Sequence, residues 1–504
     1  MRKIYSAIKI VLFFLIVFLA IGFATKIMER KESQNKYQEF MELSDQIDVL
    51  FLGSSHVLNG INPIQLYSEH GITSYNMGKP GGMVTESYWT LMNALDYCMP
   101  KCVVVDLWAL DRDYKYLDIM NGYETEEETR NSVSLLHNNM DIWPLSKTKI
   151  AAVNDLISDA AIRKEFLWNF TLYHDRWSSL TSKDFTAVSG QITDKYLLGA
   201  EQRMELYQNP QISQADDTTQ VLLGESVCLE YLYKILEVCE ERNIDVVLTF
   251  MPMATSYNQD RQAVNTAQQI ADERGIPFLN MLPHETQTVI DYYTDMSDDT
   301  HLNANGMRKM TTYIGSVLEE LYMLPDHRED ADFAEWSTKV NKWQTSEVNR
   351  ICNQTDLYTE LGEIQNINAS VIVFMRGDSK ALHDAMVRRF IKQLTGTEVI
   401  DDALSANGPY LLIRDASGKT STTAVQYEFA GEVQTENFET LLGITTYIGM
   451  NEFGAVYINE DYENNYLNME EHYNDDVQIL ILGQNGEVIS QLYYNADWKV
   501  SDNN

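Results

Sequence analysis

The chain has 504 residues, and 44% of them are hydrophobic, which is enough for about two or three domains with large cores. Its 38 Lys and Arg residues face 74 Asp and Glu residues, so the formal net charge is −36. A charge of this sign repels nucleic acid and anionic lipid, and it leaves neutral glycans, cations and basic proteins as partners. A solvated acidic surface with no partner explains the same charge.

The first 31 residues have the composition of a membrane anchor. An uncharged apolar run at residues 10–25 is shorter than the roughly 20 residues that span a bilayer, but the long side chains of Lys9 and Lys26 can reach the interface. A cleaved signal peptide is the alternative, because Gly22 and Ala24 permit cleavage. The basic residues that follow the run favour an uncleaved, single-pass signal anchor in the cell membrane, with the rest of the chain outside the cytoplasm.

The stretch Ile47–His56 is typical of a buried strand that ends at Gly53-Ser54-Ser55. In open α/β sheets, ligands bind at the carboxyl ends of parallel strands, and glycine lets the chain turn sharply there. Ser55 is therefore a candidate nucleophile. On this string alone, a serine that only caps the following helix is the simpler explanation.

Asp298 and His301 lie just before a segment with apolar residues at helical spacing. An aspartate three residues ahead of a histidine on a tight turn can orient the imidazole through one ring nitrogen. The other nitrogen can then take a proton from a serine hydroxyl. With Ser55, these residues complete a predicted triad, whereas His301 alone would be an ordinary polar residue at a helix start.

A glycine-rich stretch, residues 74–82, precedes a predicted helix at Ser87–Leu95. Glycine lets backbone amides approach a developing oxyanion that a side chain would block. This stretch therefore predicts an oxyanion-binding loop.

Together the three stretches resemble the SGNH (GDSL-like) hydrolase superfamily: Gly53-Ser54-Ser55 matches its first block, Asn76-x-Gly78-x-x-Gly81 its second, and Asp298-x-x-His301 its last. The resemblance implies that Ser55 is the nucleophile and that Asp298 supports His301 as the base. It places the amides of Ser55 and Gly81 in the oxyanion hole, with Asn76 and Gly78 in the same substrate loop. It also implies an α/β fold, with a three-layer SGNH-type parallel sheet over residues 45–323.

The third block of that superfamily carries an asparagine after the next strand, and Cys102–Asp111 contains none. One oxyanion donor is therefore missing or comes from elsewhere, so we expect hydrolysis by water to be slow. No His and carboxylate residues have the spacing of metal ligands, and neither a metal nor another cofactor is predicted.

A long insertion, residues 111–220, interrupts the alternation of strands and helices. It contains an acidic run, Glu124–Glu128, and an aromatic segment, Phe166–Trp177. The aromatic rings can form a stacking floor for a sugar, but a helical subdomain core with a polar end explains them more simply. His174 receives no catalytic role.

Alternation resumes after the insertion, with a helix at Ser226–Arg242, a strand at Ile244–Phe250 and a strand at Pro277–Met281. This order predicts parallel strands, with Asp298 and His301 after the last of them.

A polar stretch, residues 325–366, predicts a linker or a partly helical connector. Residues 367–504 predict a separate β-rich α+β domain with one helix near Ala381–Leu394. This domain resembles the interleukin-like EMT-inducer domain at Ser370–Arg376, Pro409–Arg414, Ala455–Asn465 and Gln478–Gly483. The resemblance implies a module that contacts a glycan or a protein. A scaffold with no ligand is the alternative.

Two classes of function remain open. In the first, the protein is an exported, membrane-anchored serine esterase or O-acyltransferase that carries an acyl group, most simply acetyl, on Ser55 and acts on a cell-surface polysaccharide. The resemblance extends to exported proteins of alginate-type O-acetylation and of teichoic-acid D-alanyl transfer, which implies a membrane-bound O-acyltransferase as partner. In the second, a non-catalytic surface protein uses the fold as a platform that binds a glycan or a protein.

Overall fold

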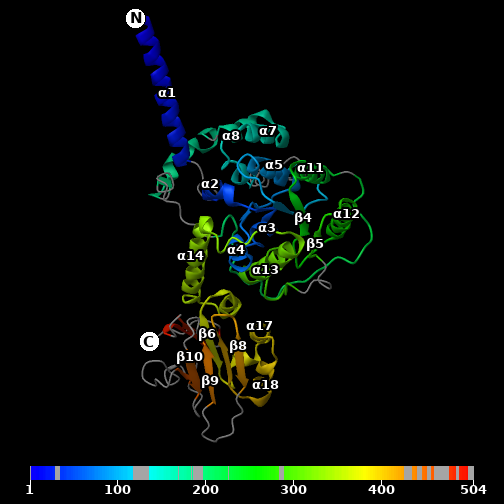
Figure 1. Ribbon diagram of the computed structural model, residues 1–504, viewed down its shortest axis with the longest axis vertical. Helices are drawn as coiled ribbons and strands as arrows, with labels where there is room; N and C mark the ends of the chain where they lie inside the picture. The colour runs from blue at the N-terminus through cyan, green and yellow to red at the C-terminus, as the bar shows by residue number, and fades with distance from the viewer. Residues whose placement is uncertain are drawn as a thin grey trace. The chain divides into compact units, whose positions relative to one another are not determined.

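The computed structural model divides into two units by the contacts within the chain (Figure 1). The first unit comprises residues 1–201, 213–288 and 311–336, and the second comprises 202–212, 289–310 and 337–504. The structure describes residues 2–28, 34–116, 135–168, 170–182, 184–185, 197–224, 226–282, 289–424, 434–439, 445–450, 456–458, 476–483, 487–495 and 497. The acidic run Glu124–Glu128 lies outside these described residues.

The core of the first unit is a five-stranded sheet in the order β2-β1-β3-β4-β5, and every pairing in it is parallel. Strands β1 and β3 are buried along their whole length, as the continuous apolar runs in the sequence predict. The α/β fold with a parallel sheet is thereby confirmed. The strands are β1 (Val49–Leu52), β2 (Ser74–Asn76), β3 (Cys102–Asp106), β4 (Asp245–Phe250) and β5 (Phe278–Asn280).

The chain reverses direction between β1 and β3. From β1 it crosses to β2 on one side, and it returns to β3 on the other side of β1. Ligands of open α/β sheets bind at such a switch point, outside the carboxyl ends of the strands. Gly53-Ser54-Ser55 follows β1 and therefore lies at this edge.

Helices cover both faces of the sheet, which makes three layers (Figure 1). On one face, α4 packs against the part of α13 in this unit, since Gln65 donates to Thr312 at 3.1 Å. On the other face, α5 packs against α11. Local signals set the helix ends: Asn62 caps α4 through the Ile64 amide, and Gly71 ends that helix with φ 70°. The helices are α3 (Ser55–Leu58), α4 (Pro63–His70), α5 (Val84–Ala94), α11 (Val227–Arg242), α12 (Asn258–Arg274) and α13 (Ala304–Leu321).

The described part of the insertion between residues 135 and 179 is mostly helical, as expected, whereas its described residues 197–220 are irregular. Phe166 is buried and stacks on His137 with ring centres 3.7 Å apart, so this end of the aromatic segment is core. Trp168 and Trp177 are exposed, and their predicted role as a sugar floor stays a prediction. The elements are α7 (Lys147–Leu156), α8 (Ala160–Leu167), α9 (Phe170–Tyr173) and the 3-10 helix η3 (His174–Ser179).

The N-terminal helix α1 (Arg2–Met28) contacts α9 and η3, and Arg176 donates a hydrogen bond to the carbonyl oxygen of Met28. Its segment Ile8–Met28 has 21 residues and a mean hydropathy of 2.6. By length and composition this segment can cross a membrane, and a signal sequence would pass the same test. A short helix, α2 (Gln34–Leu43), and the 3-10 helix η1 (Ser44–Gln46) lead into β1.

The polar connector is mostly helical, which agrees with the helical alternative for residues 325–366. Trp336 is fully buried near its start, and its indole Nε1 donates to Gln46 at 2.7 Å. The elements are η4 (Ala331–Phe333), α14 (Ala334–Ile351), α15 (Leu357–Glu363) and η5 (Ile364–Asn366).

The rest of the second unit is built on a five-stranded antiparallel sheet, in the order β13-β12-β6-β7-β8. Alternate residues of β6 join an apolar cluster with α15, α17 and α18, so one face of the sheet carries helices. The β-rich α+β class is therefore confirmed, with two helices where one was expected near Ala381–Leu394. The elements are β6 (Ser370–Met375), α16 (Lys380–His383), α17 (Ala385–Thr395), α18 (Val399–Ala406), β7 (Tyr410–Arg414), β8 (Thr420–Ala424), β9 (Gln434–Glu439), β10 (Thr445–Met450), β11 (Val456–Ile458), β12 (Val477–Leu482) and β13 (Val488–Tyr494).

Candidate active site

Two serines follow β1, and they lie in different environments. Ser54 is buried; its hydroxyl donates to Asp106 Oδ2 at 3.2 Å, and its oxygen accepts from the His56 amide, which makes Ser54 the cap of α3. Ser55 is the first residue of α3 and is half-buried. The capping role that could have explained Ser55 thus belongs to Ser54, and Ser55 is left at the carboxyl edge of the sheet.

The turn between β1 and α3 requires glycine at position 53. Gly53 has a φ of 155°, and a Cβ there would lie 2.7 Å from the Cβ of Asp106. No other residue fits so close to β3. Gly53 thus lets the ends of β1 and β3 approach at the switch point.

Asp106 joins the ends of three strands. Its carboxylate accepts from Ser54, which follows β1, and from the Met251 amide, which follows β4, at 3.3 Å. Burial raises the pKa of Asp106 to about 7, although the hydrogen bonds from Met251 and Ser54 oppose this rise. Asp106, at the end of β3, therefore links the ends of β1 and β4 through these two hydrogen bonds.

The glycine loop, residues 77–82, packs directly on Gly53. The Lys79 amide donates to the Gly53 carbonyl at 3.1 Å, and a Cβ on Gly82 would lie 2.9 Å from the same oxygen. Gly81 is half-buried with a φ of 61°. Among the residues that the structure describes, no acceptor takes the Gly81 amide. This amide therefore remains available to donate.

Asn76 and Gly78 brace the base of the loop. The Asn76 amide nitrogen donates to the carbonyls of Val57 at 2.7 Å and Ile61 at 2.9 Å, while its oxygen accepts from the Gly78 amide. A Cβ on Gly78 would lie 2.4 Å from the Leu58 amide nitrogen. These bonds hold α3 against the loop, so Asn76 and Gly78 fix the shape of the site through the backbone of α3 and of the loop.

The turn after β3 lies within Cys102–Asp111, where the resemblance to the SGNH superfamily predicts an asparagine and the sequence has none. Trp108 occupies this turn and packs edge-on against His56, with ring centres 5.4 Å apart. Ala109 adopts a φ of 66°, which is uncommon for alanine. A bulky aromatic side chain thus fills the space on this side of α3.

Asp298 and His301 form a hydrogen-bonded pair in the second unit. His301 Nδ1 lies 2.8 Å from Asp298 Oδ1, and the His301 amide donates to the same oxygen at 2.8 Å. The Thr300 amide adds a third bond at 2.9 Å. The tight turn predicted from the sequence therefore exists, and it fixes the imidazole through Nδ1, as a general base requires.

Arg203, which the sequence analysis did not single out, holds the other side of this carboxylate. Its guanidinium donates to Asp298 Oδ2 at 2.6 Å. The chain around Arg203 packs along the same turn, since the Ala304 amide donates to the Arg203 carbonyl at 2.7 Å. Arg203 lies in an irregular segment 95 positions away from Asp298, so no local pattern could have revealed the contact.

These contacts keep Asp298 ionised. Partial burial, the largest single influence, raises its pKa, but the hydrogen bonds from His301 and Thr300 together outweigh burial and hold the pKa well below the usual range. An ionised carboxylate can stabilise a positive charge that forms on the imidazole. The structure thus brings Asp298, His301 and Arg203 together in one unit, and Ser55, Asn76, Gly78 and Gly81 in the other.

Comparisons with known proteins complete the description. No protein-family profile and no curated protein matches the sequence. Among solved structures, a GDSL-like lipase from Bacteroides thetaiotaomicron covers 58% of this chain with 100% of its own, at 12% identity and a TM-score of 0.28. A two-domain esterase active on acetylated mannans covers 61% of this chain with 58% of its own, at 13% identity and a TM-score of 0.24. The resemblance of residues 367–504 to the EMT-inducer domain stays a prediction.

Proposed function

We propose that the protein is a serine esterase or O-acyltransferase that acts on acyl esters of a cell-surface polysaccharide. Ser55 is the nucleophile, His301 the general base, and Asp298 orients His301. The observation that carries this proposal is the Nδ1 hydrogen bond between His301 and Asp298, because it fixes the one imidazole orientation that a serine triad uses.

The environment of Ser55 supports its role. It stands at the carboxyl edge of the sheet, next to the switch point, while its neighbour Ser54 performs the structural work of the turn. A hydroxyl has no use as a nucleophile without a base, so the proposal requires Ser55 and His301 to act together.

In the proposed reaction, His301 takes the hydroxyl proton as Ser55 Oγ attacks the ester carbonyl. The amides of Ser55 and Gly81 stabilise the oxyanion. His301 then returns the proton to the leaving alcohol, and an acyl-Ser55 ester remains. Attack by water releases the acid, and attack by a sugar hydroxyl gives the acylated polysaccharide. No metal or other cofactor takes part.

The setting of the proposed reaction is the outer face of the cell membrane. Helix α1 is apolar enough to anchor the chain there. We propose that a membrane-bound O-acyltransferase delivers the acyl group, and that acetyl is the simplest group for this site. The partner and the polysaccharide come from the resemblance to exported acyl-transfer proteins.

A serine-directed fluorophosphonate tests the proposal on the full chain in detergent. We expect the adduct on the peptide that contains Ser55, and fragmentation within that peptide separates Ser55 from Ser54. Ser55→Ala and His301→Ala should abolish labelling, and Asp298→Asn should slow it less than His301→Ala does, because Asp298 mainly orients the base. Labelling that persists in Ser55→Ala would show that the triad assignment is wrong.

The alternative is a non-catalytic platform that keeps the fold and binds a glycan or a protein. The turn after β3 favours it, because Trp108 and Ala109 replace the expected asparagine donor. The same labelling experiment separates the two functions, since a platform without an activated serine would not react.

A further inference from the structure

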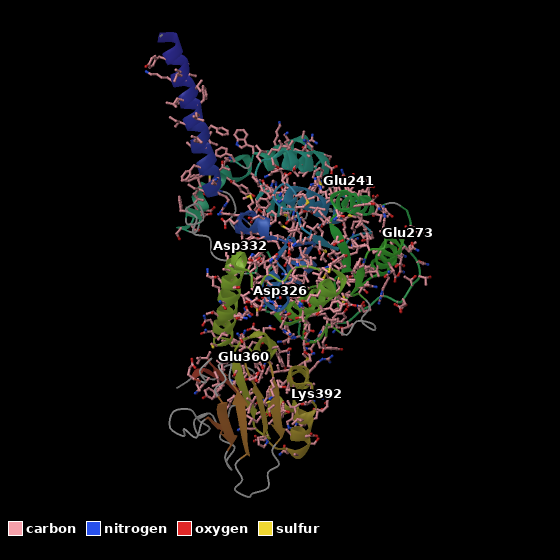
Figure 2. All side chains as sticks on the ribbon, viewed as in Figure 1. Glu241, Glu273, Asp326, Asp332, Glu360 and Lys392 are labelled. Carbon is pink, nitrogen blue, oxygen red and sulfur yellow. The ribbon has the colours of Figure 1, made fainter. Side chains whose placement is uncertain are left out.

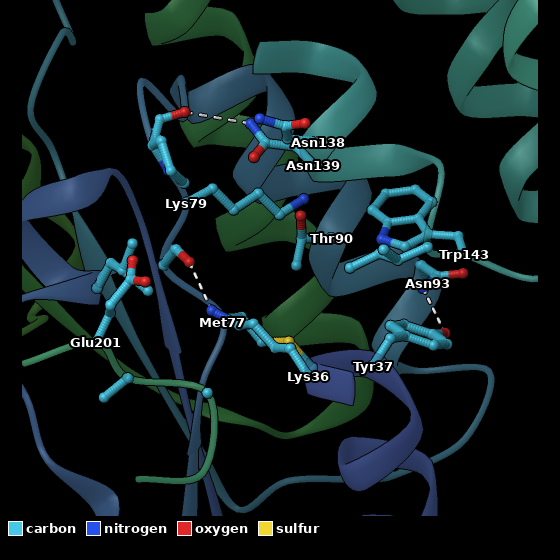
Figure 3. Close-up of a pocket in the computed structure, with 16 residues that line it drawn as sticks. Lys36, Tyr37, Met77, Lys79, Thr90, Asn93, Asn138, Asn139, Trp143 and Glu201 are labelled. Carbon is cyan, nitrogen blue, oxygen red and sulfur yellow. Dashed lines mark hydrogen bonds between the residues drawn. The ribbon is translucent and has the colours of Figure 1, made fainter. Parts of the chain in front are cut away.

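A cavity of about 190 Å³ lies beside the glycine loop in the first unit (Figure 3). Its walls are mostly apolar, with Leu58, Met77 and the ring of Trp143. The amide residues Asn93 and Asn139 and the charged residues Lys36 and Glu201 interrupt them. Ser55 does not line the cavity. The cavity is therefore separate from the proposed nucleophile. The loop that carries Gly81 also forms part of the cavity wall, through Gly78, Lys79 and Pro80.

The side chain of Lys79 extends from the glycine loop into this cavity (Figure 3). Lys79 is only 8% exposed, and its Nζ lies 4.7 Å from the centre of the Trp143 ring. Within the described part of the chain, no hydrogen-bond acceptor takes this Nζ. Burial lowers the pKa of Lys79 to about 8, and the nearby carboxylate of Glu86 opposes this only in part.

Glu86 is the acid whose charge acts on Lys79, but its oxygens accept hydrogen bonds from other groups. One of its oxygens accepts from Asn139 Nδ2 at 2.9 Å, and the other accepts from the Met83 amide at 3.5 Å. A buried ammonium group without an acceptor costs free energy, and an orphaned polar group in a native fold calls for a water or a ligand. The cavity provides the room for one.

Asn93 supplies a second unsatisfied group on the cavity wall. Its Nδ2 donates to the Tyr37 hydroxyl at 2.6 Å, and its Oδ1 has no partner among the described residues. A half turn of the Asn93 amide exchanges Nδ2 and Oδ1, and the Tyr37 hydroxyl then donates to Oδ1. In that orientation Asn93 presents a donor to the cavity, as Lys79 does.

We propose that this cavity binds a short monocarboxylate anion such as acetate or butyrate. The carboxylate accepts from Lys79 and Asn93, and the hydrocarbon part packs against Trp143 and Met77. The cavity has room for an acid of this size, since one water molecule needs only about 10–15 Å³ of such space. A sugar carboxylate such as glucuronate shares the charge, but its hydroxyls would face apolar walls without partners. This inference stands on Lys79 and its cavity and does not depend on Ser55.

The test is a titration of the full chain in detergent with ¹³C-labelled acetate, butyrate and glucuronate, followed by NMR at pH 7. We expect saturable binding of both short acids, with butyrate tighter because it covers more apolar wall. Lys79→Met should weaken binding about tenfold or more, since a hydrogen bond to a charged group is lost. The matched control is Lys101→Met, because Lys101 is half-exposed, pairs with Asp48 at 2.9 Å and precedes β3 at the opposite end of the sheet.

A second variant guards against a misfolded Lys79→Met. Trp143→Leu removes the ring but keeps the charge, and it should weaken butyrate more than acetate. Circular dichroism of each variant establishes that the fold is kept. Three results would overturn the proposal: no saturable binding of either short acid, unchanged binding in Lys79→Met, or glucuronate binding tighter than butyrate.

Discussion

At the scale of single residues, the carboxylate of Asp298 is held by two side chains. Nδ1 of His301 lies 2.8 Å from Oδ1 and 2.9 Å from Oδ2, and the Arg203 guanidinium donates to Oδ2 at 2.6 Å. A carboxylate held from both sides cannot rotate away from the imidazole. Arg203 is therefore a positioning residue, which acts on the base through Asp298.

Arg203→Gln should lower the rate of ester turnover, but less than His301→Ala does. It should lower kcat more than it raises KM, because Asp298 positions the base and not the substrate. The measurement is kcat and KM for an acetyl ester. Arg203→Lys keeps the charge and should restore most of kcat.

Arg328 offers a matched control for Arg203. It pairs with Asp326 at the same distance of 2.6 Å, and both members of this pair are exposed. Arg328→Gln should leave kcat and KM unchanged. If Arg203→Gln behaves like Arg328→Gln, Arg203 is only a surface ion pair.

At the scale of elements, helix α15 carries a carboxylic acid into an apolar core. Glu360 is fully buried, and neither of its oxygens has a partner among the described residues. Burial is the main cause that raises its pKa well above the usual range, and the charge of Glu363 adds to it. The folded protein thus holds this acid protonated.

Glu360→Gln should stabilise the protein more at pH 8 than at pH 5. A folded-state pKa above the unfolded value means that stability falls as the pH rises from the unfolded pKa towards the folded one, and glutamine removes this loss. Calorimetric unfolding at both pH values measures the difference. Glu329→Gln, at an exposed glutamate, should show no such dependence. An equal effect of Glu360→Gln at both pH values would contradict the buried, protonated acid.

Elements were predictable from sequence where one face or both faces of a regular structure are apolar. Strands β1 and β3 are buried along their length, and their apolar runs predicted them. Helix α14 is polar along most of its length and owes its place partly to Trp336, which packs on Tyr67 with ring centres 5.4 Å apart. Such a tertiary contact leaves no periodic pattern in the sequence.

In the candidate site, too, the sequence predicted the contacts set by local spacing and missed those set by tertiary packing. The pair of Asp298 and His301 was predictable, because three positions on a tight turn fix their geometry. The contact of Arg203 with Asp298 was not, because it depends on how an irregular segment packs. The role of Ser54 as a cap, which sets it apart from Ser55, needed the hydrogen bond to Asp106.

At the scale of the whole molecule, the apolar anchor favours a lipid environment and the acidic remainder of the chain favours water. Helix α1 is apolar, whereas the complete chain carries a net charge of −36. We expect the full chain to partition with membranes when cells are fractionated. Its N-terminal peptide, identified by mass spectrometry, should begin near Met1. A chain found in the medium with a new N-terminus after Ala24 would show that α1 is a cleaved signal.

The choice between hydrolysis and transfer also belongs to the whole molecule. The turn after β3 offers Trp108 where an asparagine donor was expected, and the loss of one oxyanion donor typically costs about 3 kcal/mol of transition-state stabilisation. Attack by water should therefore be slow. A bound sugar hydroxyl can recover much of this loss, because holding acceptor and acyl-serine together removes part of the entropic barrier.

We therefore expect weak hydrolysis of a model acetyl ester by the full chain, and faster acyl transfer when a polysaccharide acceptor is present. The measurement compares acetate release with the formation of acetylated glycan, with and without the acceptor. Ser55→Ala serves as the blank for both products. Trp108→Asn adds an amide donor to the turn after β3, and it should raise both products, because the same oxyanion forms whichever hydroxyl attacks. Fast hydrolysis that added glycan does not redirect would leave a plain esterase, since an enzyme that already activates water well has no need of a positioned acceptor.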